Sequence, residues 1–139
     1  MNSLSCIFLI YSALLLADTS NEGEAYEYFL KGEYALLHKN FPQAESNFSK
    51  ALTMVPDSPT ILQSLVDLKS YQGEYSDAIK YLEKIIKLTP ENKESGLELF
   101  QLYIQEGKKD DAHKLLDNLT KYYSSDIDLL YARASLQHS

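Results

Sequence analysis

The side chains best suited to metal binding or nucleophilic catalysis are few and widely separated. His38, His113 and His138 stand far apart, and none has a metal-ligand spacing with a cysteine, aspartate or glutamate. The single cysteine, Cys6, can form neither an internal disulfide nor a cysteine-based zinc site. Glycine-rich phosphate loops and a nucleophile elbow are also missing from the sequence. These features indicate a protein that is not an enzyme and that uses no metal or cofactor.

The charge balance narrows the class of partner. The 139 residues carry a formal net charge of −7, and every charged side chain lies from Asp18 onward. The longest basic cluster is Lys108-Lys109, which is followed at once by two aspartates. Nucleic acid is excluded as a partner, since its phosphates require clustered Lys and Arg. With 45% apolar and 24% charged residues, the composition is that of an ordinary globular domain.

The first 17 residues form an apolar leader. The run from Leu4 to Ala17 is shorter than the roughly 20 residues of a membrane span, and it suits the apolar core of a secretory signal peptide. Cleavage after Ala17 would make the protein periplasmic or secreted. However, Met1 to Ser5 contains no Lys or Arg, so an uncleaved membrane anchor, a packed apolar helix and a misassigned start codon remain as alternatives. Residues 18–24 are polar, and we expect a flexible lead-in there.

Small and large apolar residues recur at a fixed spacing of 34 residues. Alanine stands at three positions one period apart, and a large residue follows each alanine four positions later: Ala44, Ala78 and Ala112, then Phe48, Leu82 and Leu116. A fixed period of this length marks a stack of helical or mixed supersecondary units. One such unit cannot bury its own apolar face, so neighbouring units must stack to be stable.

Each period contains the signals of two short helices. In the second period, Ser58 is a natural N-cap, and Pro59 suits the first helical position. Gly73 separates two apolar stripes, because glycine tolerates the left-handed backbone that ends a helix. Pro90 stops the second stripe. No segment shows strand-like alternation, so we predict an all-α protein.

These residues resemble the tetratricopeptide repeat. The first copy (25–58) supplies the family's residue type at every expected position: Tyr28, Gly32, Phe41, Ala44, Phe48, Ala51 and Pro56. The second copy is 59–92, the third is 93–126, and a half copy, 127–139, closes the chain. The third copy departs from the pattern at Gly96, Phe100, Lys109, Leu119 and Ser124. The resemblance implies a right-handed α-α superhelix of about three and a half hairpins.

The resemblance also implies a concave groove lined by the first helix of each copy. The predicted groove residues are Tyr26, Phe29, Glu33, Gln63, Asp67, Glu94, Leu97, Gln101, Asp128 and Tyr131. Family members that hold the acidic tails of chaperones use Lys, Arg and Asn at such positions, and this chain has none there. We therefore expect a protein or peptide partner with a basic or neutral extended segment, and no small-molecule substrate. The alternative is that these residues form ordinary solvated helix faces.

The last half copy leaves apolar residues on more than one side of its helix. We predict a terminal interface that includes Leu129 and Leu136, because an end unit normally has a polar outer face. Truncation of the repeat array is the other explanation. Two functions follow: an exported, non-catalytic protein-interaction module, or a structural subunit of a cell-envelope assembly that makes permanent contacts through its terminal helix.

Overall fold

The computed structural model describes residues 21–137, which are helical throughout apart from short connections and contain no strand. The predicted leader, residues 1–17, lies outside the described residues. The chain divides into two compact units between Ile61 and Leu62. Each unit is considered by itself below. The described residues confirm the all-α prediction.

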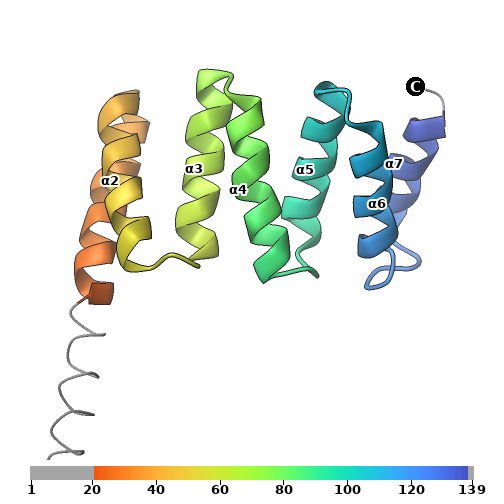
Figure 1. Ribbon diagram of the computed structural model, residues 1–139, viewed down its shortest axis with the longest axis horizontal. Helices are drawn as coiled ribbons and strands as arrows, with labels where there is room; N and C mark the ends of the chain where they lie inside the picture. The colour runs from red at the N-terminus through yellow and green to blue at the C-terminus, as the bar shows by residue number, and fades with distance from the viewer. Residues whose placement is uncertain (1–20, 138–139) are drawn as a thin grey trace, which may run out of the picture. The chain divides into compact units, whose positions relative to one another are not determined.

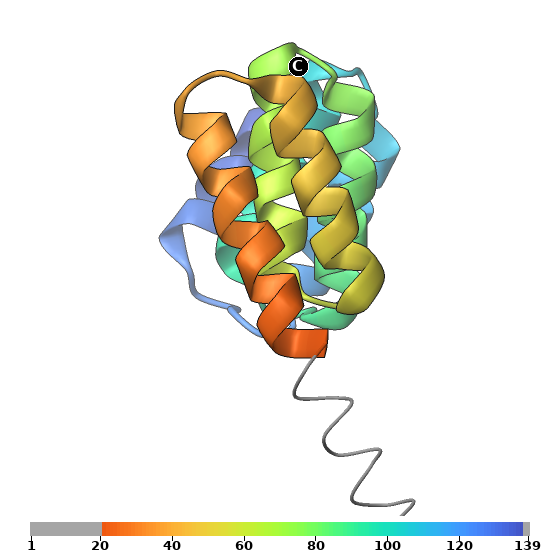
Figure 2. The same cartoon turned by 90° about the vertical axis from the view of Figure 1, so that its left-hand side faces the viewer.

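Unit 1 contains one helical hairpin. Helical residues 21–37 and helix α2 (Phe41–Met54) lie side by side and run in opposite directions (Figures 1 and 2). Their contact buries small residues of the first helix and Phe48 of α2. Residues 21–24 are helical, so the flexible lead-in predicted there is wrong for these four residues. A single glycine, Gly23, costs a helix only about 1 kcal/mol relative to alanine, and the adjoining turns absorb this cost.

Unit 2 contains most of α3 (Pro59–Gln72) and the whole of α4 (Tyr75–Leu88), α5 (Lys93–Gln105), α6 (Lys109–Leu119) and α7 (Ile127–Gln137). Successive helices alternate in direction (Figure 1). Helix α5 packs against both α4 and α6, and α6 packs against α7. The Ser58 hydroxyl accepts a hydrogen bond from the Ile61 amide, as its predicted role of N-cap requires, and the Asn92 side chain, which the sequence analysis did not single out, accepts one from the Ser95 amide.

The first helix of each copy ends in the same left-handed turn. The turn residues are Lys39, Gly73 and Gly107, with φ of 57°, 74° and 71°. In each case the amide of the next residue donates to a carbonyl five residues back, over 2.7–2.8 Å. This is the hydrogen bond that closes a Schellman motif. The sequence predicts the role of the two glycines, whereas a lysine carries the same role in the first copy.

Glycine allows the two helices of a hairpin to approach closely. A Cβ atom added to Gly32 would lie 2.5 Å from the Phe48 ring, and one added to Gly96 would lie 2.7 Å from Leu119. Gly96 and Leu119 are two of the positions at which the third copy departs from the family pattern. The structure shows that they compensate each other, because the large Leu119 fills the space that the missing Gly96 side chain leaves.

Candidate partner-binding surface

Helices α3 and α5 bring acidic side chains together in unit 2. The Gln63 amide nitrogen donates to a Glu98 carboxylate oxygen over 3.0 Å and to an Asp67 carboxylate oxygen over 3.3 Å. Gln63 and Asp67 stand one turn apart on α3, and Glu94 and Glu98 stand one turn apart on α5. One amide group therefore ties two carboxylates from neighbouring helices. We call Gln63, Asp67, Glu94 and Glu98 the acidic cluster.

Glu98 is the most perturbed group of the acidic cluster. Burial raises the pKa of its carboxyl above the ordinary value of 4.5, and the hydrogen bond from Gln63 opposes this shift. The negative charges of Asp67 and Glu94 raise the pKa further. A half-buried carboxylate that is repelled by two neighbours is stabilised by any cation that enters the cluster. The cluster is thus suited to a Lys or Arg side chain.

The sequence predicted three of the four members of this cluster and missed Glu98. The groove positions implied by the family pattern were one face of each first helix, and Glu98 lies beside that face. A signal was nevertheless available, because Glu98 follows Glu94 by one helical turn. The two other predicted residues on α5 differ in exposure: Leu97 is half-buried, and Gln101 is exposed.

The predicted groove residues on α7 have a different environment. Asp128 accepts a hydrogen bond from the Lys93 ammonium over 3.0 Å, and Asp126 accepts one from the same ammonium over 2.8 Å. Asp128 therefore shares its only counter-charge among these three residues, the Lys93 ammonium, with Asp126. Tyr131 is exposed to 71% and contributes an aromatic surface rather than a charge.

The predicted terminal interface through Leu129 and Leu136 is corrected. Both side chains are buried, with exposed fractions of 1% and 6%, so they belong to the core of unit 2. The exposed apolar residues of α7 are Ile127, Leu130 and Tyr131. Helical spacing explains why these three residues are exposed and the two leucines are not. Leu129 and Leu136 lie two turns apart on the opposite face of α7.

Two predicted aromatic residues of the groove, Tyr26 and Phe29, lie in unit 1, whereas Tyr131 lies on α7 of unit 2. The ring centroids of Tyr26 and Phe29 are 6.3 Å apart, and those of Phe29 and Phe48 are 6.2 Å apart. Tyr26 and Phe29 line a hollow of about 290 Å³ whose other wall includes Val55, Ser58, Thr60 and Ile61. Glu33, the third predicted residue of this unit, is half-buried. The hollow offers aromatic contact area with a polar rim, which suits an extended peptide.

Residues 21–137 contain neither a group of side chains that could hold a metal ion nor a helix that could span a membrane. Within them, no group of three His, Cys, Asp or Glu side chains could hold a metal ion. None of the helices in this part of the chain has the length and apolar composition needed to span a membrane. The His38 ring nitrogen Nδ1 lies 2.8 Å from the Tyr34 carbonyl oxygen, and His113 is exposed. His138 lies outside the described residues.

Comparison with known proteins agrees with the geometry. Residues 71–136 match the family model described as tetratricopeptide repeat. Residues 71–136 therefore carry repeats of the tetratricopeptide repeat family. Among curated proteins, this chain is 27% identical over 124 residues to Protein CTR9 homolog of Arabidopsis thaliana. The match covers 87% of this chain, which spans only 11% of the length of that relative.

Solved tetratricopeptide repeat structures share the fold. A tetratricopeptide repeat protein from Parabacteroides merdae has a TM-score of 0.72 at 19% identity, over 96% of this chain and 56% of that one. The first tetratricopeptide repeat domain of Spaghetti (RPAP3), solved with the HSP90 peptide SRMEEVD, has a TM-score of 0.64 at 10% identity. That match covers 84% of this chain and 95% of the other. The right-handed helical solenoid is thereby established as the fold.

Proposed function

We propose that this tetratricopeptide repeat protein is a non-catalytic interaction module that binds a basic or neutral extended segment of a partner protein. The observation that carries the proposal is the acidic cluster of unit 2. Glu98 is half-buried beside two further carboxylates, and Gln63 orients it. A Lys or Arg of the partner would supply both the hydrogen-bond donors and the positive charge that this cluster lacks.

The charge of the cluster opposes the kind of peptide held by the Spaghetti domain. The peptide SRMEEVD in that structure ends in three acidic residues among its last four. Asp67, Glu94 and Glu98 would repel such a sequence. The proposal therefore keeps the peptide-binding role of the fold and reverses the charge of the ligand.

The aromatic hollow of unit 1 supports the same type of ligand. Tyr26 is 62% exposed, and it stands beside the ring of Phe29 at the rim of the hollow. Exposed aromatic side chains next to a hollow provide affinity without charge, because they bury much apolar area at a low entropic cost. We assign apolar affinity to the rings within unit 1 and charge selection to the acidic cluster within unit 2, each as a separate site.

Two classes of peptide test the proposal. Fluorescence anisotropy would compare extended peptides rich in Lys and Arg with acidic peptides of the same length. We expect only the basic set to bind, and we expect Glu98→Gln and Asp67→Asn to weaken that binding by about tenfold together. Glu106→Gln is the matched control, because this exposed carboxylate lies two turns beyond Glu98 at the end of α5. Equal binding of both peptide classes, or equal loss in the control, would refute the proposal.

The cellular location is part of the proposal. The apolar run from Leu4 to Ala17 supports export by a cleaved signal peptide, with membrane anchoring if the leader is retained. Amino-terminal sequencing of the protein purified from its native compartment would test this. A chain that begins at Asp18 is expected, and an intact Met1 in a soluble extract would contradict export.

A permanent subunit of a cell-envelope assembly is the second candidate function. The exposed apolar residues of α7, Ile127, Leu130 and Tyr131, favour this alternative. The salt dependence of the complex separates the two functions. A partner held by the acidic cluster should dissociate in high salt, whereas a partner held by an apolar α7 interface should remain bound.

A further inference from the structure

One face of the first helix exposes four large apolar or aromatic residues. Their spacing of four, four and three residues places them in a single stripe along the helix. They are exposed to 62%, 48%, 67% and 79% respectively: Tyr26, Leu30, Tyr34 and Leu37. Isolated exposed apolar residues are common, but a continuous row of this kind marks an interaction surface. We call these four residues the apolar stripe.

At one position of the stripe, the 34-residue period shows that an equivalent side chain is buried elsewhere in the chain. Tyr34 is equivalent, two periods later, to Leu102 of α5. Leu102 is only 8% exposed, whereas Tyr34 is 67% exposed. In unit 2, α5 has both α4 and α6 packed against it. Both units thus carry a large side chain at this position, which is buried in unit 2 and exposed in unit 1.

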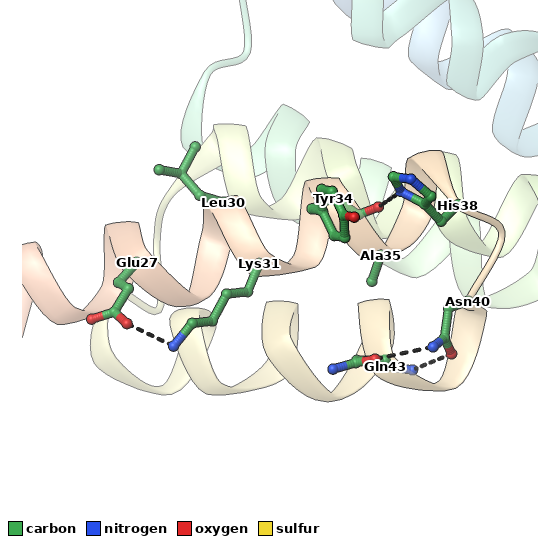
Figure 3. Close-up of a pocket in the computed structure, with 8 residues that line it drawn as sticks. All are labelled: Glu27, Leu30, Lys31, Tyr34, Ala35, His38, Asn40 and Gln43. Carbon is green, nitrogen blue, oxygen red and sulfur yellow. Dashed lines mark hydrogen bonds and ion pairs between the residues drawn. The ribbon is translucent and has the colours of Figure 1, made fainter.

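A hollow continues the apolar stripe on one side. It measures about 360 Å³, and Leu30, Tyr34 and Ala35 contribute its apolar lining (Figure 3). The Tyr34 ring lies 4.2 Å from the His38 ring, centroid to centroid. The His38 ring is fixed in turn by its contact with the Tyr34 carbonyl oxygen. The surface is therefore ordered before any partner arrives, and the hollow can admit a side chain from that partner.

The charges beside the stripe identify its occupant. Glu27 and Lys31 flank the stripe on the side of the hollow, one turn apart, and their carboxylate oxygen and ammonium nitrogen are 2.6 Å apart (Figure 3). An antiparallel second copy of the same helix would place each Glu27 opposite a Lys31 of the other copy. Such a two-fold arrangement is self-complementary in charge, and it pairs one apolar stripe with another.

We propose that the protein forms a symmetric homodimer through the apolar stripe. Two copies of the first helix pack antiparallel about a two-fold axis beside position 29, which puts Leu30 at the buried centre of the interface, with Tyr26 and Tyr34 on either side of it. Glu27 and Lys31 form reciprocal ion pairs between the copies at its edge. Tyr26 belongs to both the stripe and the aromatic hollow, so the dimer would compete with a partner for that ring, whereas no residue of the acidic cluster belongs to the stripe.

Sedimentation velocity of the full chain over a dilution series tests the dimer. We expect a reversible dimer for the native sequence and a monomer for Leu30→Glu and for Tyr34→Glu, whose exposed positions tolerate a charge without unfolding. Leu130→Glu is the matched control, because Leu130 is 54% exposed on α7 of unit 2. This variant should keep the dimer.

A charge exchange tests the antiparallel register. Lys31→Glu should weaken the dimer by about tenfold or more, because four carboxylates then face one another. Adding Glu27→Lys to the same chain should restore the dimer, since each lysine again lies opposite a glutamate. A native chain that stays monomeric, a dimer that survives Leu30→Glu, or a dimer lost in Leu130→Glu would overturn the proposal. None of these residues lies in the acidic cluster, so peptide binding can fail or succeed independently.

Discussion

The first helix of unit 1 and helix α5 of unit 2 hold the same place in the repeat but present different surfaces. Leu30 and Glu98 are equivalent positions two periods apart, and so are Tyr34 and Leu102. At these positions the first helix exposes apolar residues, whereas α5 carries the carboxylate of Glu98 and buries Leu102. The repeat thus fixes where a helix lies, and the residues away from the hairpin contact decide what it binds.

These two helices pack against their hairpin partners in the same way. Each helix uses a glycine to admit one large side chain of the second helix: Gly32 admits Phe48, and Gly96 admits Leu119. The two glycines stand at different positions of the repeat, one turn apart. What the fold preserves is a close approach between helices, and more than one pair of positions can provide it.

The substitution with the largest expected effect disrupts this close approach between the first helix and α2. In Gly32→Ala, the new Cβ would lie 2.5 Å from Cδ1 and Cε1 of Phe48 and 3.1 Å from Cγ. The ring cannot move away without displacing α2, because Phe48 is fully buried. We expect a loss of about 3 kcal/mol in the free energy of unfolding, measured by urea denaturation and circular dichroism.

The equivalent change in α5 should cost less. Gly96→Ala places a Cβ 2.7 Å from a terminal methyl carbon of Leu119, which can rotate, and we expect a loss of about 1–2 kcal/mol. Phe48→Leu combined with Gly32→Ala should recover part of the first loss. Gly23→Ala is the control, since nothing lies within 4 Å of its added Cβ, and it should be neutral or stabilising. Equal effects at Gly23 and Gly32 would contradict the packing argument.

The next effect sharpens the comparison at the ends of the same two helices. The turn that follows the first helix contains Lys39 at φ 57°, and the turn that follows α5 contains Gly107 at φ 71°. Because glycine adopts the left-handed region without steric cost, Lys39→Gly should stabilise the protein by about 0.5–1 kcal/mol. Gly107→Ala should destabilise it by about 1 kcal/mol. Urea denaturation midpoints check both values, and a destabilised Lys39→Gly variant would show that the turn carries no strain.

Much of the fold could be predicted from the sequence, because the signals that define helices are local. The spacing of the alanines, the N-cap Ser58 and the turn at Gly73 locate the helices closely. The role of Lys39 could not be predicted, because a lysine in the sequence does not indicate a left-handed backbone. The pairing of Gly96 with Leu119 could not be predicted either, because it joins two departures that look independent in the sequence.

The candidate sites were less accessible, because exposure depends on neighbouring helices. The family resemblance pointed to Asp67 and Glu94, but it could not show that Gln63 reaches Glu98 on another helix. Leu129 and Leu136 look like the unfinished end of an array, and the structure buries both. A pattern within one helix separates its two faces, but it does not reveal which face a neighbour covers.

The smallest expected effect tests the acidic surface of α5. Because burial raises the pKa of Glu98, the folded protein binds a proton there more tightly than the unfolded chain does. The associated stability is present below about pH 4.5 and is lost as the pH rises through the higher pKa of the folded state. Glu98→Gln should therefore stabilise the protein near pH 7 by at most about 1 kcal/mol, because water screens the half-exposed carboxyl. It should also flatten the fall in urea midpoint between about pH 4.5 and 7, whereas Leu30→Gln at the equivalent position of the first helix should leave that slope unchanged. A steeper fall in the Glu98→Gln variant would mean that Glu98 gains more from Gln63 than it loses to Asp67, Glu94 and burial.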